Sequence, residues 1–274
     1  MRFSGHESFH CRSLWLKKGY DHLKSGHDFE DEAPVLLGVG KNMVSSIRYW
    51  VKSFGLVDTD NETIKPVADK IFSENGWDPF LEDEGTLWLL HYWLVSEGFA
   101  SIYATVFNEL RKRKPLFTLS HFKDLVSGFG YNVSPNTLKT DFQVFIRTYI
   151  SKKNEKDLED SLSGILTELE LVTEHKNGLK IEPANRPNLP LDILLYCILN
   201  GHSGSNSISF ETLHSEKDDV GSVFALSREG LNDLLEGVSE EFKDITYSNE
   251  AGVRELQLKK PINPLNILKK YYES

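Results

Sequence analysis

Cysteine is scarce in this sequence, and long apolar runs are missing. The 274 residues contain two cysteines, Cys11 and Cys197, which lie far apart and form no CxxC pair. This spacing argues against a disulfide framework and a cysteine-based zinc site, and it favours two reduced thiols in a cytoplasmic protein. No apolar run approaches the roughly 18 residues that a membrane-spanning helix needs, so we expect no membrane segment. The first residues, MRFSGHESFHCRS, lack the apolar region of a secretory signal.

Recognisable catalytic signatures are also missing. The stretch GVGKN at 38–42 lacks the GxxxxGK[ST] spacing of a phosphate-binding loop. The stretch HESFH at 6–10 matches H-E-x-x-H, which binds zinc when a helix places both imidazoles on one face. Here no helical pattern precedes it and no third ligand can be assigned, so we expect a structured loop. His6 and Glu7 are kept as candidates for acid/base catalysis.

Acidic residues are in excess, but only in the second part of the chain. Residues 1–153 contain 19 Lys/Arg and 19 Asp/Glu, whereas residues 154–274 contain 12 and 22 and carry the whole net charge of -10. The first part is therefore compatible with a nucleic-acid surface. We predict two domains, 1–153 and 154–274, with a loose boundary in the charged stretch KKNEKDLEDS.

Amphipathic helices fill the first 150 residues. Apolar spacing and end signals predict helices over 13–23, 31–37, 41–54, 66–73, 84–95, 101–111, 119–127 and 136–150. The helix over 41–54 gathers large apolar side chains on one face and basic or small ones on the other, with no acid between Lys41 and Phe54. The polar segment that follows, between Val57 and Ile64, suits a small two-stranded wing.

The helix over 136–150 repeats this pattern 95 residues later. Each of the two helices follows a shorter apolar helix and a Gly-containing turn, which is the helix-turn-helix arrangement. In such pairs the second helix enters the major groove of DNA. We therefore predict that cations on both helices contact phosphates, and that the amide and hydroxyl side chains contact bases or phosphates. The cations are Lys41, Arg48, Lys52, Lys139 and Arg147, and the others are Asn42, Ser45, Asn136, Thr137 and Thr140.

A third helix pair, over 210–214 and 228–236, is followed by a hairpin starting at Ile245. Between Glu211 and Glu250 there are 11 acids and 3 bases, which opposes contact with DNA and favours contact with a partner protein. The predicted fold is mainly α, with tandem helix-turn-helix or winged-helix-like units and small β wings.

Four carboxylates cluster before the helix over 84–95. Asp78, Glu82, Asp83 and Glu84 could hold Mg²⁺ or Mn²⁺, which take oxygen ligands and support phosphodiester hydrolysis. The alternative is that these acids satisfy the dipole of the helix that follows. As a hypothesis, Asp78, Glu82 and Asp83 are metal ligands, and Asp78 and Asp83 are catalytic.

Five segments resemble the motifs of the SspB-like family. They are FSGHESF…R at 3–12, WLKKGYD at 15–21, LGVGKNMVSSIRYW at 37–50, GWDPFLEDEGTLWLLHYWL at 76–94 and SPNTLKTDFQVFIRTY at 134–149. The family pattern includes His6, Glu7 and Asp141 but not His10, and this departure supports treating H-E-x-x-H as accidental.

The resemblance implies a bacterial protein of single-strand DNA phosphorothioation, a phage-defence system. It implies double-stranded DNA as ligand and three partner proteins, a cysteine desulfurase, an ATPase and an ATP-pyrophosphatase-like sulfurtransferase. It also implies nicking of one strand, so that sulfur can replace a phosphate oxygen. Two alternatives remain open, a non-catalytic DNA-binding module that targets the sulfur-transfer enzymes, and a purely protein-binding scaffold.

Overall fold

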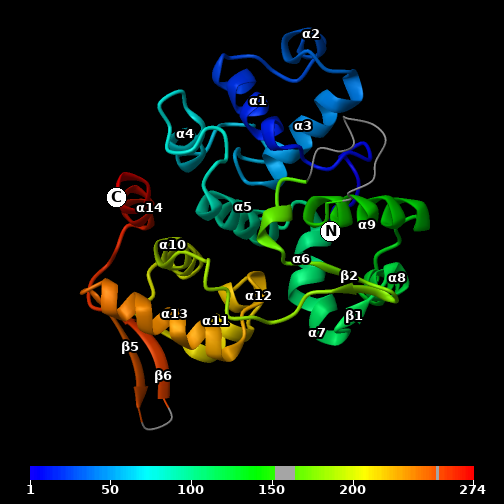
Figure 1. The fold of residues 1–274 in the computed structure, drawn as a ribbon. Helices are drawn as coiled ribbons and strands as arrows, with labels where there is room; N and C mark the ends of the chain where they lie inside the picture. The colour runs from blue at the N-terminus through cyan, green and yellow to red at the C-terminus, as the bar shows by residue number, and fades with distance from the viewer. Residues whose placement is uncertain (152–163, 251–252) are drawn as a thin grey trace. The chain divides into compact units, whose positions relative to one another are not determined.

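The chain forms two compact units, shown in Figure 1. The computed structural model describes residues 1–151, 164–250 and 253–274. The first unit comprises Met1–Ile181 and the second Glu182–Ser274. The boundary that the sequence predicts after residue 153 falls within residues 152–163, outside the described residues. Residues 178–181 belong to the first unit because strand β3 (Gly178–Lys180) pairs with β1 (Leu116–Phe117).

The first unit is mainly helical, and every helix expected from the sequence is present with its ends within two residues. Its helices are α1 (Ser13–Lys24), α2 (Ala33–Leu37), α3 (Lys41–Ser53), α4 (Pro66–Phe72), α5 (Glu84–Ser96), α6 (Ser101–Thr105), α7 (Arg111–Arg113), α8 (Leu119–Gly128) and α9 (Pro135–Tyr149). A π-helical turn, η1 (Val106–Leu110), joins α6 to α7, and a 3-10 turn, η2 (Thr167–Leu169), follows α9. The fold class is thus mainly α with small β elements.

Both expected helix pairs are present, and their ends follow from local chemistry. Gly38 ends α2 in the left-handed region at φ +64, where glycine has no side-chain penalty. Ser134 precedes α9, and its hydroxyl accepts the Thr137 N–H at 3.1 Å while Pro135 takes the first helical position. Helix α3 packs against α2, and α9 packs against α8.

The expected wing after α3 is reduced to a single antiparallel bridge between Val57 and Ile64. A larger sheet lies further along the first unit, where β1, β2 (Thr173–His175) and β3 form an antiparallel sheet in the order β1-β3-β2. The hairpin of β2 and β3 starts more than 20 residues after α9 ends. The chain order from α6 is therefore helix, strand, helix, helix, strand, strand.

The second unit has a similar order, with one more helix between its first two strands and a further helix at its end. It contains α10 (Leu191–Gly201), β4 (Ser207–Ser209), α11 (Phe210–Ser215), α12 (Val220–Val223), α13 (Arg228–Glu241), β5 (Ile245–Glu250), β6 (Val253–Leu258) and α14 (Pro264–Glu273). The sheet order is β4-β6-β5, with the last strand again in the middle and Tyr247 opposite Leu256. The expected third helix pair and hairpin are thus present. The hairpin turn expected at 250–252 includes residues 251–252, which lie outside the described part.

The core of the first unit is rich in aromatic side chains around α5 and α9. Every residue of α5 from Gly85 to Val95 is buried, so this helix has no solvated face. On α9, Phe145 and Tyr149 are buried and lie against Tyr103 of α6, with ring centroids 5.6 and 6.1 Å apart. This packing fixes the position of α9 through its inner face.

Candidate nucleic-acid interface

Residues 1–12 form a loop that precedes α1, and the H-E-x-x-H match is not on a helix. Three non-glycine residues of this loop, Ser4, Glu7 and Ser8, have positive φ angles, which are uncommon and mark a tightly constrained path. His6 and His10 are buried, whereas Glu7 is exposed. The loop thus separates the two predicted acid/base candidates, placing one inside the protein and the other at its surface.

A buried histidine–aspartate pair joins this loop to α9. His6 Nε2 lies 3.0 Å from Asp141 Oδ1, and both side chains are nearly inaccessible to solvent. The backbone N–H of Ser8 points at His6 Nδ1 at 3.2 Å, so in the neutral ring Nδ1 accepts and Nε2–H donates to the carboxylate. The Ser4 N–H also donates to Asp141, at 3.1 Å from each oxygen. Both ring nitrogens of His6 are therefore engaged, which leaves no free nitrogen for acid/base chemistry.

The same loop also contacts α3. The Trp50 indole N–H donates to the Phe9 carbonyl at 3.2 Å, and the His6 ring packs edge-on to Tyr49 with centroids 5.5 Å apart. Gly5 has φ +104, and a Cβ there would lie 2.7 Å from Tyr49 Cδ2, so only glycine fits. Residues 3–9, which we call the N-terminal staple, thus hold α3 and α9 together although these helices are far apart in sequence.

The outer face of α3 is only partly free. Lys41, Asn42 and Ser45, at the start of the helix, are exposed. Further along, the Glu62 carboxylate lies 2.6 Å from Arg48 Nε and 2.8 Å from Lys52 Nζ.

Glu62 comes from the segment after α3, and its titration reflects the two cations beside it. Burial raises the pKa of the Glu62 carboxyl, but hydrogen bonds and charges from Lys52 and Arg48 outweigh this, so the pKa lies below its ordinary value. The predicted cationic face is therefore neutralised near its C-terminal end by a residue that the sequence pattern did not place there. Arg48 and Lys52, which are two of the predicted phosphate contacts, would have to release the Glu62 carboxylate before they could bind DNA phosphates.

The outer face of α9 is similar at its N-terminal end. Asn136 and Lys139 are exposed, whereas Thr137 and Thr140 are half-buried. The Thr140 hydroxyl donates to the Asn136 carbonyl at 3.0 Å, and Arg147 donates to the Ser8 carbonyl of the N-terminal staple. The exposed candidates on both helices thus lie within the first five residues of each helix, whereas Arg48, Lys52 and Arg147 contact other parts of the protein.

The acidic segment before α5 is organised by backbone N–H groups. Asp78 is buried and accepts from the N–H groups of Glu82 and Asp83 at 2.9 and 3.1 Å. Asp83 caps α5 by accepting from Gly85 and Thr86. Among the described residues no three or more His, Cys, Asp or Glu side chains are grouped so that they could hold a metal ion. The metal site at Asp78, Glu82 and Asp83 therefore stays a prediction.

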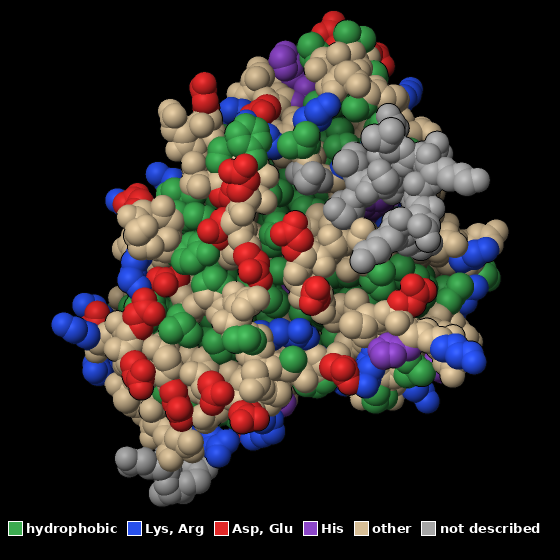
Figure 2. Space-filling model, viewed as in Figure 1, with side chains coloured by type: hydrophobic (Ala, Val, Ile, Leu, Met, Phe, Trp, Pro, Cys, Tyr) green, Lys and Arg blue, Asp and Glu red, His purple; other side chains and the backbone are tan. Residues whose placement is uncertain are grey.

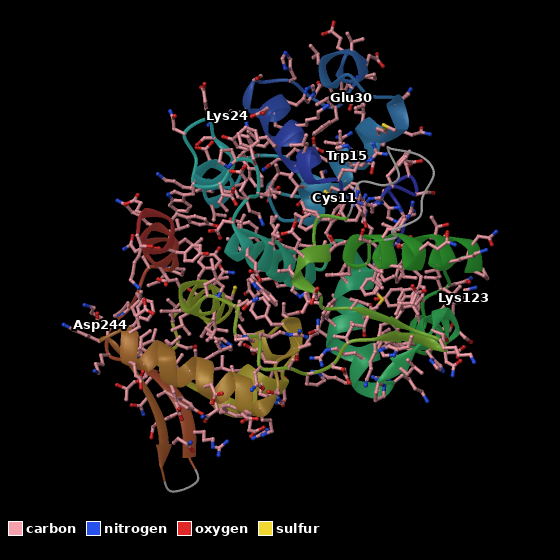
Figure 3. All side chains as sticks on the ribbon, in the orientation of Figure 1. Cys11, Trp15, Lys24, Glu30, Lys123 and Asp244 are labelled. Atoms are coloured by element: carbon pink, nitrogen blue, oxygen red, sulfur yellow. The ribbon has the colours of Figure 1, made fainter. Side chains whose placement is uncertain are left out.

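Charge differs between the two units. On the face seen in Figure 2, Asp and Glu side chains spread over the region of α13 in the second unit. Figure 3 labels Lys123 on α8, Trp15 on α1, and Cys11 just before α1. Burial raises the pKa of both cysteine thiols.

Among the residues that the structure describes, no helix combines the length and apolar character of a membrane span.

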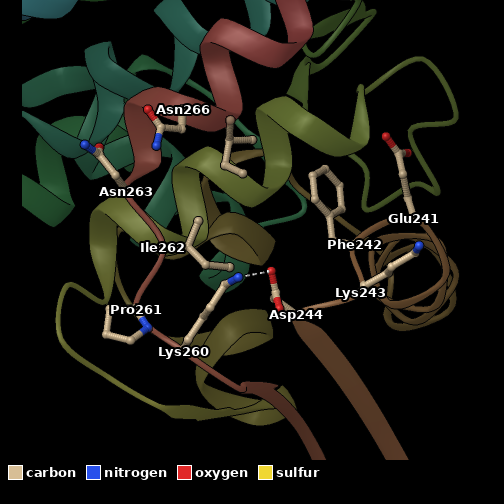
Figure 4. Close-up of a pocket in the computed structure, with 10 residues that line it drawn as sticks. Glu241, Phe242, Lys243, Asp244, Lys260, Pro261, Ile262, Asn263 and Asn266 are labelled. Carbon is tan, nitrogen blue, oxygen red and sulfur yellow. Dashed lines mark ion pairs between the residues drawn. The ribbon is translucent and has the colours of Figure 1, made fainter.

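A pocket in the second unit, shown in Figure 4, lies between the end of α13 and the start of α14. Lys260 Nζ lies 2.8 Å from Asp244 Oδ2 at its edge, and Phe242 and Ile262 line it. None of the predicted site residues lies in this pocket.

Comparison with known proteins gives the class of this chain. The family model described as "Protein of unknown function (DUF4007)" matches residues 3–272, so the chain belongs to that family. A search of the curated proteins finds no match.

Two solved structures are similar to the fold along almost its whole length. They are described as "Magnesium ion-bound SspB crystal structure" and "SspB crystal structure", with TM-scores of 0.87 and 0.86. Each is 27% identical, and the alignment covers 99% of this chain and 88% of the other. The resemblance to SspB expected from the sequence motifs is confirmed.

Proposed function

We propose that this protein binds double-stranded DNA in the cytoplasm as a component of the phosphorothioation system, through the first turns of α3 and α9. The observation that carries the proposal is the N-terminal staple, which bonds to both helices and so keeps their outer faces in one arrangement. Lys41 and Lys139 supply charge for phosphates, and Asn42 and Asn136 supply amide groups for base edges or phosphates.

The element order supports a winged-helix interpretation. In both units a helix, a strand, a group of two or three helices and two strands follow one another, and the last strand lies between the other two. In this arrangement the second helix of the pair is the DNA-reading one, which is α9 in the first unit. The hairpin of β2 and β3 would then be its wing, with Lys176 in the turn.

The second unit is proposed to contact a partner protein. Its corresponding helix, α13, carries acids, and Arg228 at its start pairs with Glu211. Such a surface repels DNA and suits a basic protein surface. The cysteine desulfurase, the ATPase and the ATP-pyrophosphatase-like sulfurtransferase implied by the family resemblance are the candidates.

Strand nicking is the finer proposal, and a non-catalytic targeting module is its alternative. A similar SspB structure is described as magnesium-bound, which favours a metal-dependent reaction. The engaged carboxylates of Asp78 and Asp83 and the occupied ring of His6 favour the alternative. Glu7 remains an exposed carboxylate, so its acid/base role can be tested directly.

The binding proposal is tested by measuring duplex affinity across a range of salt concentrations. The Lys41→Ala/Lys139→Ala variant should bind more weakly, and its log-log salt slope should fall by about 0.9 for each phosphate that the protein no longer neutralises. Lys259→Ala/Lys260→Ala, in the second unit, removes the same charge and should leave the slope unchanged. Absence of duplex binding at low salt would refute the proposal.

The nicking proposal is tested by conversion of supercoiled plasmid to open circles with Mg²⁺, Mn²⁺ or EDTA. Glu7→Gln and Asp78→Asn/Asp83→Asn are compared with the Lys41→Ala/Lys139→Ala variant. Metal-dependent nicking that disappears when one of these sets of carboxylates is replaced, while duplex affinity stays intact, supports an enzyme. Protein that binds duplex but leaves plasmid supercoiled supports the targeting module.

A further inference from the structure

The turn between α8 and α9 exposes two aromatic side chains. Phe129 is 37% exposed and Tyr131 is 44% exposed, and Gly130 between them has φ +81. Two partly exposed aromatic rings two residues apart offer an apolar surface to a ligand. The turn lies next to the first turn of α9, which belongs to the proposed DNA face.

A cation lies over one of these rings. The Arg113 guanidinium lies 5.9 Å from the centroid of the Phe129 ring, and Lys114 beside it is exposed. From Ser127 to Thr140 the sequence contains one cation, Lys139, and no acid. Glu109 pairs with Arg113 at 2.7 Å, but both side chains are exposed and such a pair contributes little.

The equivalent part of the other helix pair differs. Its turn, residues 38–40, contains no aromatic residue, and the exposed apolar side chains on α2 are the aliphatic Val35 and Leu36. Glu30, Asp31 and Glu32 directly precede α2 and are exposed. The combination of aromatic rings and cations is therefore specific to the second helix pair.

We propose that the turn of Phe129 and Tyr131 stacks an unpaired DNA base, while Arg113, Lys114 and Lys139 contact the neighbouring phosphates. Aromatic rings beside cations are the usual means of binding single strands, because every base offers a π face and every nucleotide a phosphate. This inference rests on the proposed DNA binding. It adds that the preferred ligand is a duplex with one strand opened.

The test uses fluorescence anisotropy to compare an intact 20-base-pair duplex with the same duplex in which four thymidines of one strand are unpaired, because the nucleotides opposite them are missing. We expect the gapped duplex to bind on the order of tenfold more tightly, given the typical contribution of one or two stacked bases. Phe129→Leu/Tyr131→Leu keeps the apolar bulk but removes the rings, and it should abolish the preference without changing affinity for the intact duplex.

Two controls separate this inference from the proposed function. Val35→Ala/Leu36→Ala removes exposed apolar side chains from the other pair and should keep the gap preference. Lys41→Ala/Lys139→Ala should weaken binding of both duplexes. If the intact duplex binds but the gap gives no advantage, or the advantage survives in the Leu variant, stacking is refuted and DNA binding stands. If neither duplex binds, both proposals fail.

A spectroscopic measurement is independent of affinity. With 2-aminopurine in place of one gap base, stacking on a ring should change its fluorescence when the protein binds. The change should be absent in Phe129→Leu/Tyr131→Leu at saturating protein. An equal change in that variant would overturn the proposal.

Discussion

The hydrogen bond between His6 and Asp141 predicts a large coupling free energy between these two distant residues. Replacing Asp141 by alanine removes the acceptor of the buried His6 Nε2–H and of the Ser4 N–H. Ser4 is exposed, so water can replace its acceptor, but the imidazole N–H is buried and stays unsatisfied. We expect Asp141→Ala to lower the free energy of unfolding by about 3 kcal/mol.

His6→Ala should cost about 3–5 kcal/mol, because it removes the imidazole N–H that donates to the buried Asp141 carboxylate. The double variant removes both groups and should cost less than the sum of the single changes. The difference, the coupling free energy, should be about 2 kcal/mol.

Tryptophan fluorescence makes this measurable in guanidinium titrations, because all five tryptophans lie within the first unit. Asp219→Ala is the matched control, since Asp219 lies 2.8 Å from His202 in the second unit. It should shift the fluorescence transition far less than Asp141→Ala does. A coupling below about 0.5 kcal/mol, the usual limit of additivity, would refute the role of the pair in joining the staple to α9.

Three further predictions concern single positions. Gly5→Ala should lower the free energy of unfolding by about 2–3 kcal/mol in the same titration, because the new Cβ meets the Tyr49 ring and φ is positive. Glu62→Gln should cost about 1 kcal/mol at pH 7. Because folding lowers the Glu62 pKa, its contribution is complete above the unfolded pKa of about 4.3 and disappears as the pH falls through the folded pKa, so the difference between the two proteins in thermal melts should shrink as the pH falls below about 4.3. Cys11 and Cys197 should not react with a thiol reagent within minutes in native protein but should both react in denaturant, since both are buried.

The sequence predicted the helices well because each carries its own signals. Apolar spacing defined α3 and α9, Pro135 marked the start of α9, and Gly38 marked the end of α2. Strands were harder to predict, because β1 and β2 have two and three residues, and β1 gains its bonds from a partner more than 50 residues away. No local pattern reports such pairing.

The candidate site was predicted in part. The helix faces were identified, but the roles of Glu62 and Asp141 were missed, because both depend on contacts made after the chain folds back. The one available signal was Asp141 itself, the only acid in the helix predicted over 136–150. In the structure it is buried and its partner is His6.

The N-terminal staple also constrains how this protein is made. A ribosome adds roughly 5–20 residues per second, so the synthesis of α9 is completed about 7–30 seconds after residue 6 has been made. During that interval the staple lacks its partners on α9, and His6 has no carboxylate to bond. The first unit therefore cannot complete its fold until more than half of the chain has been synthesised, and a premature stop before Asp141 would leave His6 without its carboxylate partner.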